Sequence, residues 1–441
     1  MKRKTLKFID KNNGITRRID KKTVIVAALA LGLALALGSA YLLYNRYYGN
    51  APHISIHEYQ PLSYDWKQTA SENNIVSEYL WSRTKKLMLK NSVLIPSECR
   101  IAGRLTGEDE EVSGTYKLSD QALLLKAYIK AEDRSAAIKL KDEVNKVFGL
   151  ENGLYLTESD KEKGTEVSSD IEWIDAYLSF YALYGTKDDF SRIEQCVKQL
   201  FGDDGLLKPY KLKTPVHDPE SDIEADRLEN FDKSTLEEVY GSGSVSDEET
   251  VEFEGVKLSD MNLRLISDLE QNSLLPAGSY DKALEITLGG LLSEDIPYYA
   301  YAFTFGEDKA PVYMYSAMRA GCVDIPGSIK VMEYLSDMGK LPDKVYSDFK
   351  NSVVNDRILY NTYYIAADNS GGGEASDSYA SAMRVAINKG DLDLYGRLCN
   401  VIGSRVANRQ DSPALYMIFR QDGNRYDFLA SENLGIRLVS G

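Results

Sequence analysis

The stretch SSDIEWIDAYLSFYALYGTKDDF, residues 168–190, predicts the fold of most of this chain. Its apolar residues recur at the spacing of a helix from Ser169 to Tyr184. The polar turn YGTKDD (184–189) interrupts this pattern, and a second periodic segment runs from Lys187 to Phe201. Two helices joined by a short turn pack as antiparallel neighbours, so the stretch predicts a helical hairpin.

The same pattern recurs along the chain, and several of its segments are joined by turns rich in Gly, Asp or Asn. The further periodic segments are Ile75 to Met88, Leu118 to Ala131, Ser135 to Val147, Leu258 to Glu270, Tyr280 to Leu291, Ser328 to Met338, Glu374 to Asn388, Asp391 to Ala407 and Glu432 to Val439. About a dozen helices in consecutive hairpins indicate an all-α toroid or solenoid.

Few segments depart from the helical pattern. YYAYAFTF (298–305) and VYMYS (312–316) predict one short β-hairpin. The stretch 214–250 is acidic and lacks periodicity, so we interpret it as a long loop or insertion. DNSGGGEAS (368–376) is interpreted as a flexible loop that opens a helix.

A long apolar segment precedes the helical region. Thr23 to Tyr44 holds 22 residues without a charge, which is enough for a helix to cross the roughly 30 Å hydrocarbon core of a bilayer. We interpret it as a single membrane anchor followed by a stalk at 45–70 and a folded domain at 71–441. A cleaved signal peptide is the alternative, because Gly38-Ser39-Ala40 resembles a cleavage site.

The charge of the chain differs on the two sides of this segment. Residues 1–22 hold nine Lys or Arg and two Asp, a net +7, which places them in the cytoplasm by the positive-inside rule. The remainder holds 43 basic and 65 acidic residues, a net −22, and is expected outside the cell. An acidic domain argues against a nucleic-acid partner, which needs a basic surface.

The chain offers few metal ligands of the usual kinds. It has only three His, and its four Cys (Cys99, Cys196, Cys322 and Cys399) form no CxxC pair, so neither a His-rich site nor a zinc ribbon is expected. Acidic runs such as 108–111 lack the spacing of an EF-hand calcium loop. We therefore expect no metal and no organic cofactor.

Several segments, taken in order, resemble bacterial glycoside hydrolase family 8, and most of all its subgroup found with exopolysaccharide synthesis systems. They are YKLSDQALLLKAYIKAEDR (116–134), SSDIEWIDAYLSFYALYGTKDDF (168–190), SYDKALEITLGGLLSEDIPYYAYAF (279–303), GGGEASDSYASAMRVAINKGDLDLY (371–395), SPALYMIF (412–419) and SENLGIRL (431–438). The resemblance implies an (α/α)6 barrel, in which inner and outer helices alternate, and an enzyme that cleaves β-linked polysaccharides with inversion.

Inverting hydrolysis needs a carboxylic acid that protonates the leaving oxygen and a carboxylate base that activates water. The resemblance implies Asp120 as the acid, where the family has Glu, and Asp260 as the base. The family's Gly near the acid is replaced by Leu123. Because Asp is one methylene shorter than Glu, and a misplacement of about 1 Å can cost a hundredfold in rate, activity is in question.

The resemblance also implies residues that contact sugar. Asp170 stands where the family has an Asp near the central subsite, and Glu374 where the subgroup has a Glu at a helix start. Trp173, Tyr298 and Tyr299 are candidates for stacking on sugar rings.

A plain structural reading accompanies these assignments. Asp120, Asp170 and Asp260 each follow a Ser at an expected helix start, where Ser and Asp serve as caps. Aromatic residues at helical spacing are usually core residues. The two readings are compatible if the inner helices all begin at one end of the barrel, because their first-turn residues then line one cleft.

Three hypotheses of function follow. The first is a membrane-anchored hydrolase that acts on a β-linked surface polysaccharide or exopolysaccharide. The second is a catalytically inactive polysaccharide-binding or assembly subunit beside an exopolysaccharide synthase or exporter. The third is a helical protein–protein scaffold in the cell envelope.

Overall fold

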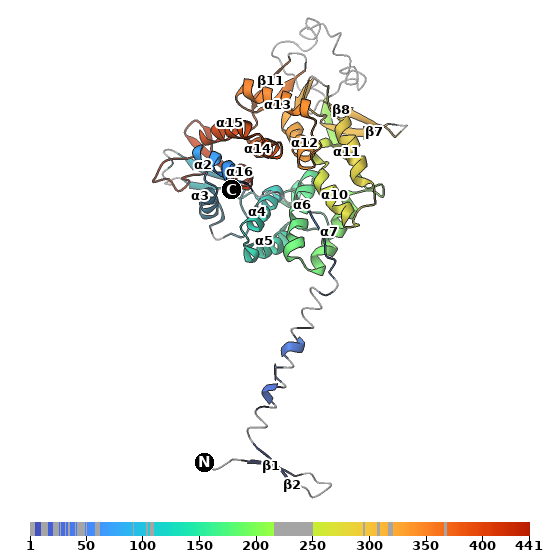
Figure 1. The fold of residues 1–441 in the computed structure, drawn as a ribbon, viewed down its shortest axis with the longest axis vertical. Coiled ribbons are helices and arrows are strands. Elements are labelled where there is room, and N and C mark those ends of the chain that lie inside the picture. The colour runs from blue at the N-terminus through green and yellow to red at the C-terminus, as the bar shows by residue number, and fades with distance from the viewer. Residues whose placement is uncertain are drawn as a thin grey trace. The chain divides into compact units, whose positions relative to one another are not determined.

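A computed structural model of the chain describes residues 5–9, 16–20, 51–57, 62–90, 92–102, 105, 110–215, 250–293, 296–306, 309–315, 321–365 and 368–441, with a few residues between 26 and 49 (Figure 1). The chain divides into two compact units, Met1–His53 with Gly185–Ser191, and Ile54–Tyr184 with Arg192–Gly441. In the first unit, β1 (Thr5–Ile9) pairs antiparallel with β2 (Thr16–Asp20).

The expected membrane helix at 23–44 lies mostly outside the described residues. Within the part of the chain that the structure describes, no helix is both long enough and apolar enough to span a membrane. Those residues of 23–44 that are described are helical, and the large apolar ones among them, Val26, Leu29, Leu33, Leu37 and Tyr41, are all exposed.

An inner ring of helices forms the centre of the second unit (Figure 1). Among the described residues it consists of α4 (Leu118–Lys130), α6 (Val167–Tyr184), α10 (Leu263–Gln271), α12 (Ile325–Asp337), α14 (Tyr379–Asn388) and α16 (Ala430–Ser440). The helix α4 packs on α6 and α16, α14 packs on α12 and α16, and α10 packs on α12. The short helix η4 (Leu258–Asp260) contacts α6 and α12, and so closes the ring.

The other helices alternate in sequence with the inner ones from α3 onward, and α2 precedes them. They are α2 (Tyr64–Glu72), α3 (Ser77–Thr84) with its continuation η1 (Lys85–Leu89), α5 (Arg134–Val147), α7 (Lys187–Leu200), α11 (Ser279–Gly289), α13 (Asp343–Asp356) and α15 (Leu392–Gly403). α5 packs on α4, α11 on α10 and α15 on α14. α3 packs on α16, so helices from the two ends of the chain complete the circle. The expected (α/α)6 barrel is confirmed.

Short sheets occupy the connections that lead into the inner helices. One has the strand order β12 (Arg420–Asp422), β13 (Arg425–Leu429), β3 (Glu98–Ala102), β4 (Glu110–Val112). Another has the order β5 (Tyr210–Pro215), β6 (Thr250–Lys257), β7 (Ala302–Phe305), β8 (Pro311–Met314). The third has the order β11 (Asn369–Glu374), β10 (Tyr360–Tyr364), β9 (Cys322–Asp324). Because alternating helices are antiparallel, all these connections lie at the end of the barrel where the inner helices begin.

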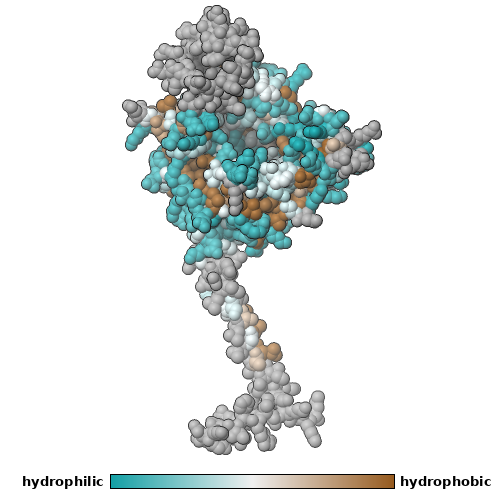
Figure 2. All heavy atoms as spheres, turned by 180° about the vertical axis from the view of Figure 1, so that it is seen from behind, coloured by the Kyte–Doolittle hydropathy of each residue, from teal (hydrophilic) through white to brown (hydrophobic). Residues whose placement is uncertain are grey.

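The apolar residues of the helices face each other between the two rings. In α6 the buried apolar side chains include Ile171, Trp173, Ile174, Tyr177 and Phe180, which cover most of its circumference, as expected of a helix enclosed on all sides. Figure 2 shows one face of the molecule, where hydrophobic residues form separate patches among hydrophilic ones.

The structure differs from the sequence-based expectations at the expected stalk and at the expected loop 368–376. The packed unit begins at Ile54, which is only 5% exposed, and α2 begins at Tyr64, so a stalk does not extend to residue 70. Residues 369–374 form strand β11 rather than a loop, and the helix after it begins at Tyr379. The expected β-hairpin is confirmed as β7 and β8. Residues 216–249 of the acidic insertion lie outside the described residues.

The segment before α2 is tied to the barrel through His57. Its Nδ1 lies 2.5 Å from Asp268 Oδ1 on α10, and its backbone N–H donates to the same oxygen at 2.9 Å. Arg264 Nη1 donates to the His57 carbonyl at 3.3 Å. The Asp268 side chain is 3% exposed, so it depends on these contacts.

Replacing His57 by Ala is expected to lower the free energy of unfolding of the full chain by about 1–2 kcal/mol, because the buried Asp268 carboxylate loses its side-chain partner. Denaturant unfolding of the protein in detergent measures this. His53→Ala is the matched control, since His53 is exposed and is expected to change nothing. An equal effect of both substitutions would contradict the anchoring role of His57.

Candidate functional site

Acidic residues stand at the start of several inner helices. Asp120 lies in the first turn of α4, Asp170 in the first turn of α6 and Glu432 in the first turn of α16, while Asp324 caps α12. A negative charge is favourable at a helix N-terminus, which accounts for each residue locally. The topology gathers them at one end of the barrel, so the capping role and a place at a common site are compatible.

Asp120 is buried at the beginning of α4 and is only 3% exposed. Among the described residues, its Oδ2 has no hydrogen-bond partner. Burial raises the pKa of Asp120 to about 7, and the nearby Ser97 hydroxyl and Lys117 charge offset this only in part. The group therefore keeps its proton close to neutral pH, as a general acid requires.

Asp260 lies in η4, between the inner helices α6 and α12, and is 5% exposed. Its Oδ2 accepts hydrogen bonds from Ser168 Oγ at 2.9 Å and from the Tyr210 hydroxyl at 2.5 Å. The Lys257 backbone N–H donates to the Tyr210 oxygen at 3.1 Å and holds that hydroxyl in place. Burial raises the pKa of Asp260, against the opposing effects of Tyr210, Lys257 and Ser168.

Glu172 connects these two carboxyl groups. Burial in the barrel raises its pKa, the Lys330 and Lys126 charges lower it, and the Asp260 charge raises it. The charge of Glu172 in turn raises the pKa of Asp120. Glu172 thus lies within electrostatic reach of both Asp120 and Asp260, and we call these three residues the carboxylate cluster.

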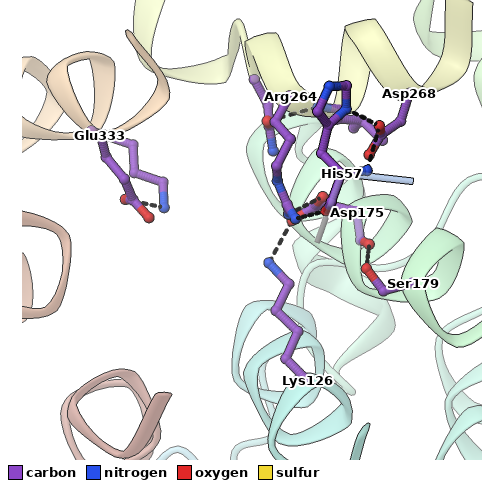
Figure 3. Close-up of polar contacts among 10 residues, drawn as sticks. His57, Lys126, Asp175, Ser179, Arg264, Asp268 and Glu333 are labelled. Carbon is purple, nitrogen blue, oxygen red and sulfur yellow. Dashed lines mark hydrogen bonds and ion pairs between the residues drawn. The ribbon is translucent and has the colours of Figure 1, made fainter. Parts of the chain in front are cut away.

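Ion pairs lie between the inner helices in two separate groups, one around Asp175 and one at Glu333 (Figure 3). Arg264 of α10 donates two hydrogen bonds to Asp175 of α6, at 2.6 and 2.7 Å, and Lys126 of α4 donates a third at 2.5 Å. On α12, Lys330 and Glu333 pair at 3.0 Å. Burial alone would raise the pKa of Asp175, but Arg264 and Lys126 hold it below its usual range. Asp175 is therefore ionised and structural.

Asp170 and Trp173, both expected at the sugar site, are covered. Asp170 is 1% exposed, and its Oδ1 accepts the Tyr155 backbone N–H at 2.9 Å. Burial raises its pKa to about 7. The Trp173 ring is fully buried, with the Tyr155 and Tyr177 ring centroids 5.8 and 5.7 Å away. Neither side chain presents a surface to a ligand in this structure.

Tyr298 and Tyr299 are likewise core residues, exposed by 3% and 1%, and the Tyr298 ring packs on Tyr363 at 5.1 Å. Glu374, at the end of β11, accepts a hydrogen bond from the Tyr379 hydroxyl at 2.6 Å and pairs with Arg405. These contacts satisfy Glu374 within the fold. Asp120 and Asp260 are related in the structure only through Glu172, whose charge reaches both, and Tyr298, Tyr299 and Glu374 have no part in that arrangement.

Glu172 and Tyr210 were not among the residues expected from the sequence. The signal for Glu172 is its spacing from Asp175 and Ser179, which places the three polar side chains on one face of an otherwise apolar helix. No comparable signal exists for Tyr210, because its contact with Asp260 joins residues 50 positions apart. Across the described residues, no group of three or more His, Cys, Asp or Glu is arranged to hold a metal ion.

Helical hairpins closed into a ring, with inner and outer helices, define an (α/α)6 barrel. Solved structures of similar fold include an alpha-amylase from Clostridium perfringens, 16% identical, which covers 86% of this chain and 99% of that one with a TM-score of 0.60.

Two further structures are similar at lower scores. A beta-1,3-1,4-glucanase from Paenibacillus sp. X4 is 10% identical and covers 90% of this chain and 96% of that one, with a TM-score of 0.51. A cellobiose 2-epimerase from Spirochaeta thermophila is 11% identical and covers 84% and 96%, with a TM-score of 0.50. No family model matches the chain, and no curated protein matches its sequence. The six-hairpin fold implied by the resemblance to family 8 is therefore confirmed.

Proposed function

We propose that this protein is a membrane-anchored, extracytoplasmic glycoside hydrolase that cleaves a β-linked surface polysaccharide or exopolysaccharide with inversion. The observation that carries this proposal is the carboxylate cluster at the start of the inner helices, with one group that keeps its proton near neutral pH. Two of the similar structures are named as an amylase and a glucanase, which supports a glycan as the substrate.

Asp120 and Asp260 divide the chemistry. Asp120, whose burial raises its pKa to about 7, donates the proton to the leaving glycosidic oxygen. Asp260 takes a proton from the attacking water on the opposite face of the sugar. Ser168 and Tyr210 both donate to its Oδ2, which fixes the carboxylate and leaves Oδ1 for the water.

Glu172 takes the sugar-orienting role in place of Asp170. It lies within electrostatic reach of both Asp120 and Asp260, whereas the Asp170 carboxylate is engaged by the Tyr155 backbone. Burial raises the pKa of Glu172, and the Lys330 and Lys126 charges oppose this. In either protonation state its carboxyl group accepts hydrogen bonds from sugar hydroxyls, which holds the ring over the acid and the base.

The anchor is the segment 23–44. Its support is the uncharged sequence, the basic residues before it, and the exposure of the apolar side chains described within it. An extracytoplasmic domain held close to the membrane meets a polysaccharide as it leaves the cell. We therefore propose an exopolysaccharide synthase or exporter as its partner.

A second function, glycan binding without cleavage, is favoured by the burial of the expected site residues. Asp120 is 3% exposed, and its Oδ2 is enclosed, so a substrate oxygen reaches it only if the surroundings open. Trp173, Tyr298 and Tyr299 are buried as well. An inactive polysaccharide-binding or assembly subunit would need neither an accessible acid nor a base.

Measuring reducing ends separates the two functions. The full chain in detergent is incubated with β-glucans, poly-N-acetylglucosamine, starch and the exopolysaccharide of the producing organism. We expect release from a β-linked polymer and none from starch. Release from starch alone would contradict the β-linkage, and binding of a β-linked polymer without any release would establish the second function.

A further inference from the structure

A hollow on the outside of the barrel lies between α3 and the turn around Tyr416. Its volume is about 320 Å³, and it is lined by Tyr79, Ser82, Arg83, Lys86 and Tyr416. This volume falls in the range of small-molecule sites, roughly 300–1,000 Å³. None of its residues belongs to the carboxylate cluster, so it is a separate place on the molecule.

The two tyrosines form an aromatic wall of this hollow. Their rings stack with centroids 4.9 Å apart and an interplanar angle of 29°, and Tyr79 remains 53% exposed. A half-exposed ring, held by a neighbour, offers a preorganised apolar face with a hydroxyl at its edge. This is the surface on which the C–H face of a pyranose ring packs.

The backbone holds Tyr416 in place in an unfavourable conformation. Its φ is 73°, in the left-handed region that bulky residues avoid. Its N–H donates to the Ala407 carbonyl at 2.7 Å, and the Ala407 N–H donates to the Met417 carbonyl at 2.9 Å. A Gly would adopt this turn without strain, so the ring is not explained by the needs of the turn.

The hollow is basic in a domain that is acidic as a whole. Arg83 and Lys86 lie one turn apart along α3 and η1, so they present adjacent positive charges. In the part of the chain that the structure describes, neither forms an ion pair. An Arg–Lys pair beside a hydroxyl, Ser82, matches a carboxylate or phosphate.

We propose that this hollow is a second glycan-binding site, which holds a sugar residue bearing an anionic substituent. The sugar ring packs on the Tyr79–Tyr416 pair, and its carboxylate or phosphate lies between Arg83 and Lys86. The net charge of −22 repels polyanions elsewhere on the domain. The site therefore selects polymers whose anionic substituents lie far apart along the polymer or at its end.

Isothermal titration of the full chain in detergent tests the proposal with three probes: β-linked oligoglucuronate, a neutral cello-oligosaccharide of the same length, and glucose 6-phosphate. We expect oligoglucuronate or glucose 6-phosphate to bind and the neutral oligosaccharide to bind at least about tenfold more weakly, and we expect added salt to reduce the difference. Which of the two anionic probes binds more tightly identifies the substituent. Equal binding of all three probes would overturn the proposal.

Two variants locate the site. Arg83→Ala combined with Lys86→Ala is expected to weaken anionic-sugar binding about tenfold, whereas the charge-matched control Lys146→Ala with Lys198→Ala leaves it unchanged. Tyr416→Gly removes the ring but suits the backbone, so binding falls while the thermal midpoint stays the same or rises. If both variants bind like the wild type, the proposal fails.

Further readouts separate this proposal from other possibilities. Reducing-end release from a neutral glycan is expected to be the same in the Arg83/Lys86 variant and the wild type, so a failure of the hydrolase proposal leaves this test intact. Phosphatidylglycerol vesicles serve as a fourth probe. Vesicle binding that the variant loses, without binding of any sugar, would assign the hollow to a membrane surface and overturn the glycan site.

Discussion

Replacing Asp120 by Asn is expected to lower reducing-end release by about 10²–10⁴-fold, the contribution of a general acid. Asn has almost the same shape as Asp but carries no transferable proton. The matched control is Asp170→Asn, in the first turn of the neighbouring inner helix. Asp170 is equally buried and has a pKa of about 7, but its Oδ1 only accepts the Tyr155 N–H, a contact that Asn retains.

The control variant is expected to keep its activity within about tenfold of the wild type. Loss of release in both variants would instead indicate a structural role for the two residues. Unchanged release in Asp120→Asn would contradict the assignment of the acid.

Asp120→Asn, which is expected to lower activity, is expected to raise the stability of the folded chain. The pKa of Asp120 rises from an ordinary 3.8 to about 7 in the folded protein, so the folded chain binds this proton more tightly than the unfolded chain. The wild type therefore loses stability as the pH rises from about 4 to about 7, by up to roughly 4 kcal/mol at 1.4 kcal/mol per unit. The Asp120→Asn variant escapes this loss because its side-chain amide never ionises.

Denaturant unfolding of the wild type and Asp120→Asn at pH 5 and pH 8 checks the direction of this effect. The variant is expected to be more stable than the wild type mainly at pH 8. Release by the wild type is expected to fall above a pH of about 7, as the acid loses its proton. A variant that is less stable than the wild type at both pH values would show that the Asp120 carboxylate is needed in ionised form.

Replacing Asp175 by Asn is expected to lower the free energy of unfolding by about 3–5 kcal/mol. The substitution removes the carboxylate that pairs with both Lys126 and Arg264, whose side chain is 6% exposed. Denaturant unfolding of the full chain measures the effect. The control is Asp393→Asn, since Asp393 is 60% exposed and its ion pairs contribute little.

The two variants test what holds the inner ring together. Asp175 joins α4, α6 and α10 through its three hydrogen bonds, so its loss weakens contacts among three helices at once (Figure 3). Similar losses for Asp175→Asn and Asp393→Asn would mean that the interior network does not stabilise the barrel. A loss of stability confined to Asp175→Asn would show that the interior network stabilises the barrel.

The helices were predictable from sequence where their apolar pattern was broad. Ser169 to Tyr184 and Lys187 to Phe201 differ from α6 and α7 by no more than two residues at either end. α13 was not predicted, because only Val345, Phe349 and Val353 are buried on it and so narrow a stripe gives a weak signal. Most of the short strands were not predicted either, because strands of three to six residues carry little alternating pattern of their own.

The site was predictable only in part. Asp120 and Asp260 were expected from the resemblance to family 8, because a Ser-Asp pair at a helix start by itself indicates only a cap. The surroundings of an acidic residue on the inner helices depend on packing: Asp170 accepts the Tyr155 backbone N–H, whereas Glu172 lies within electrostatic reach of Asp120 and Asp260. Burial also decides which role the aromatic candidates have. Trp173 is of a residue type that stacks on sugar rings, but its side chain lies in the core.

The most direct test of the central claim is proton NMR of the first product released from the cleaved β-linked polysaccharide. An acid and a base on opposite faces of the sugar, with water between them, deliver the α-anomer first, and the β-anomer appears only later by mutarotation. We predict an α-anomeric signal at the earliest time points with the wild type and none with Asp120→Asn. A β-anomeric signal that appears first would contradict the assigned roles of Asp120 and Asp260.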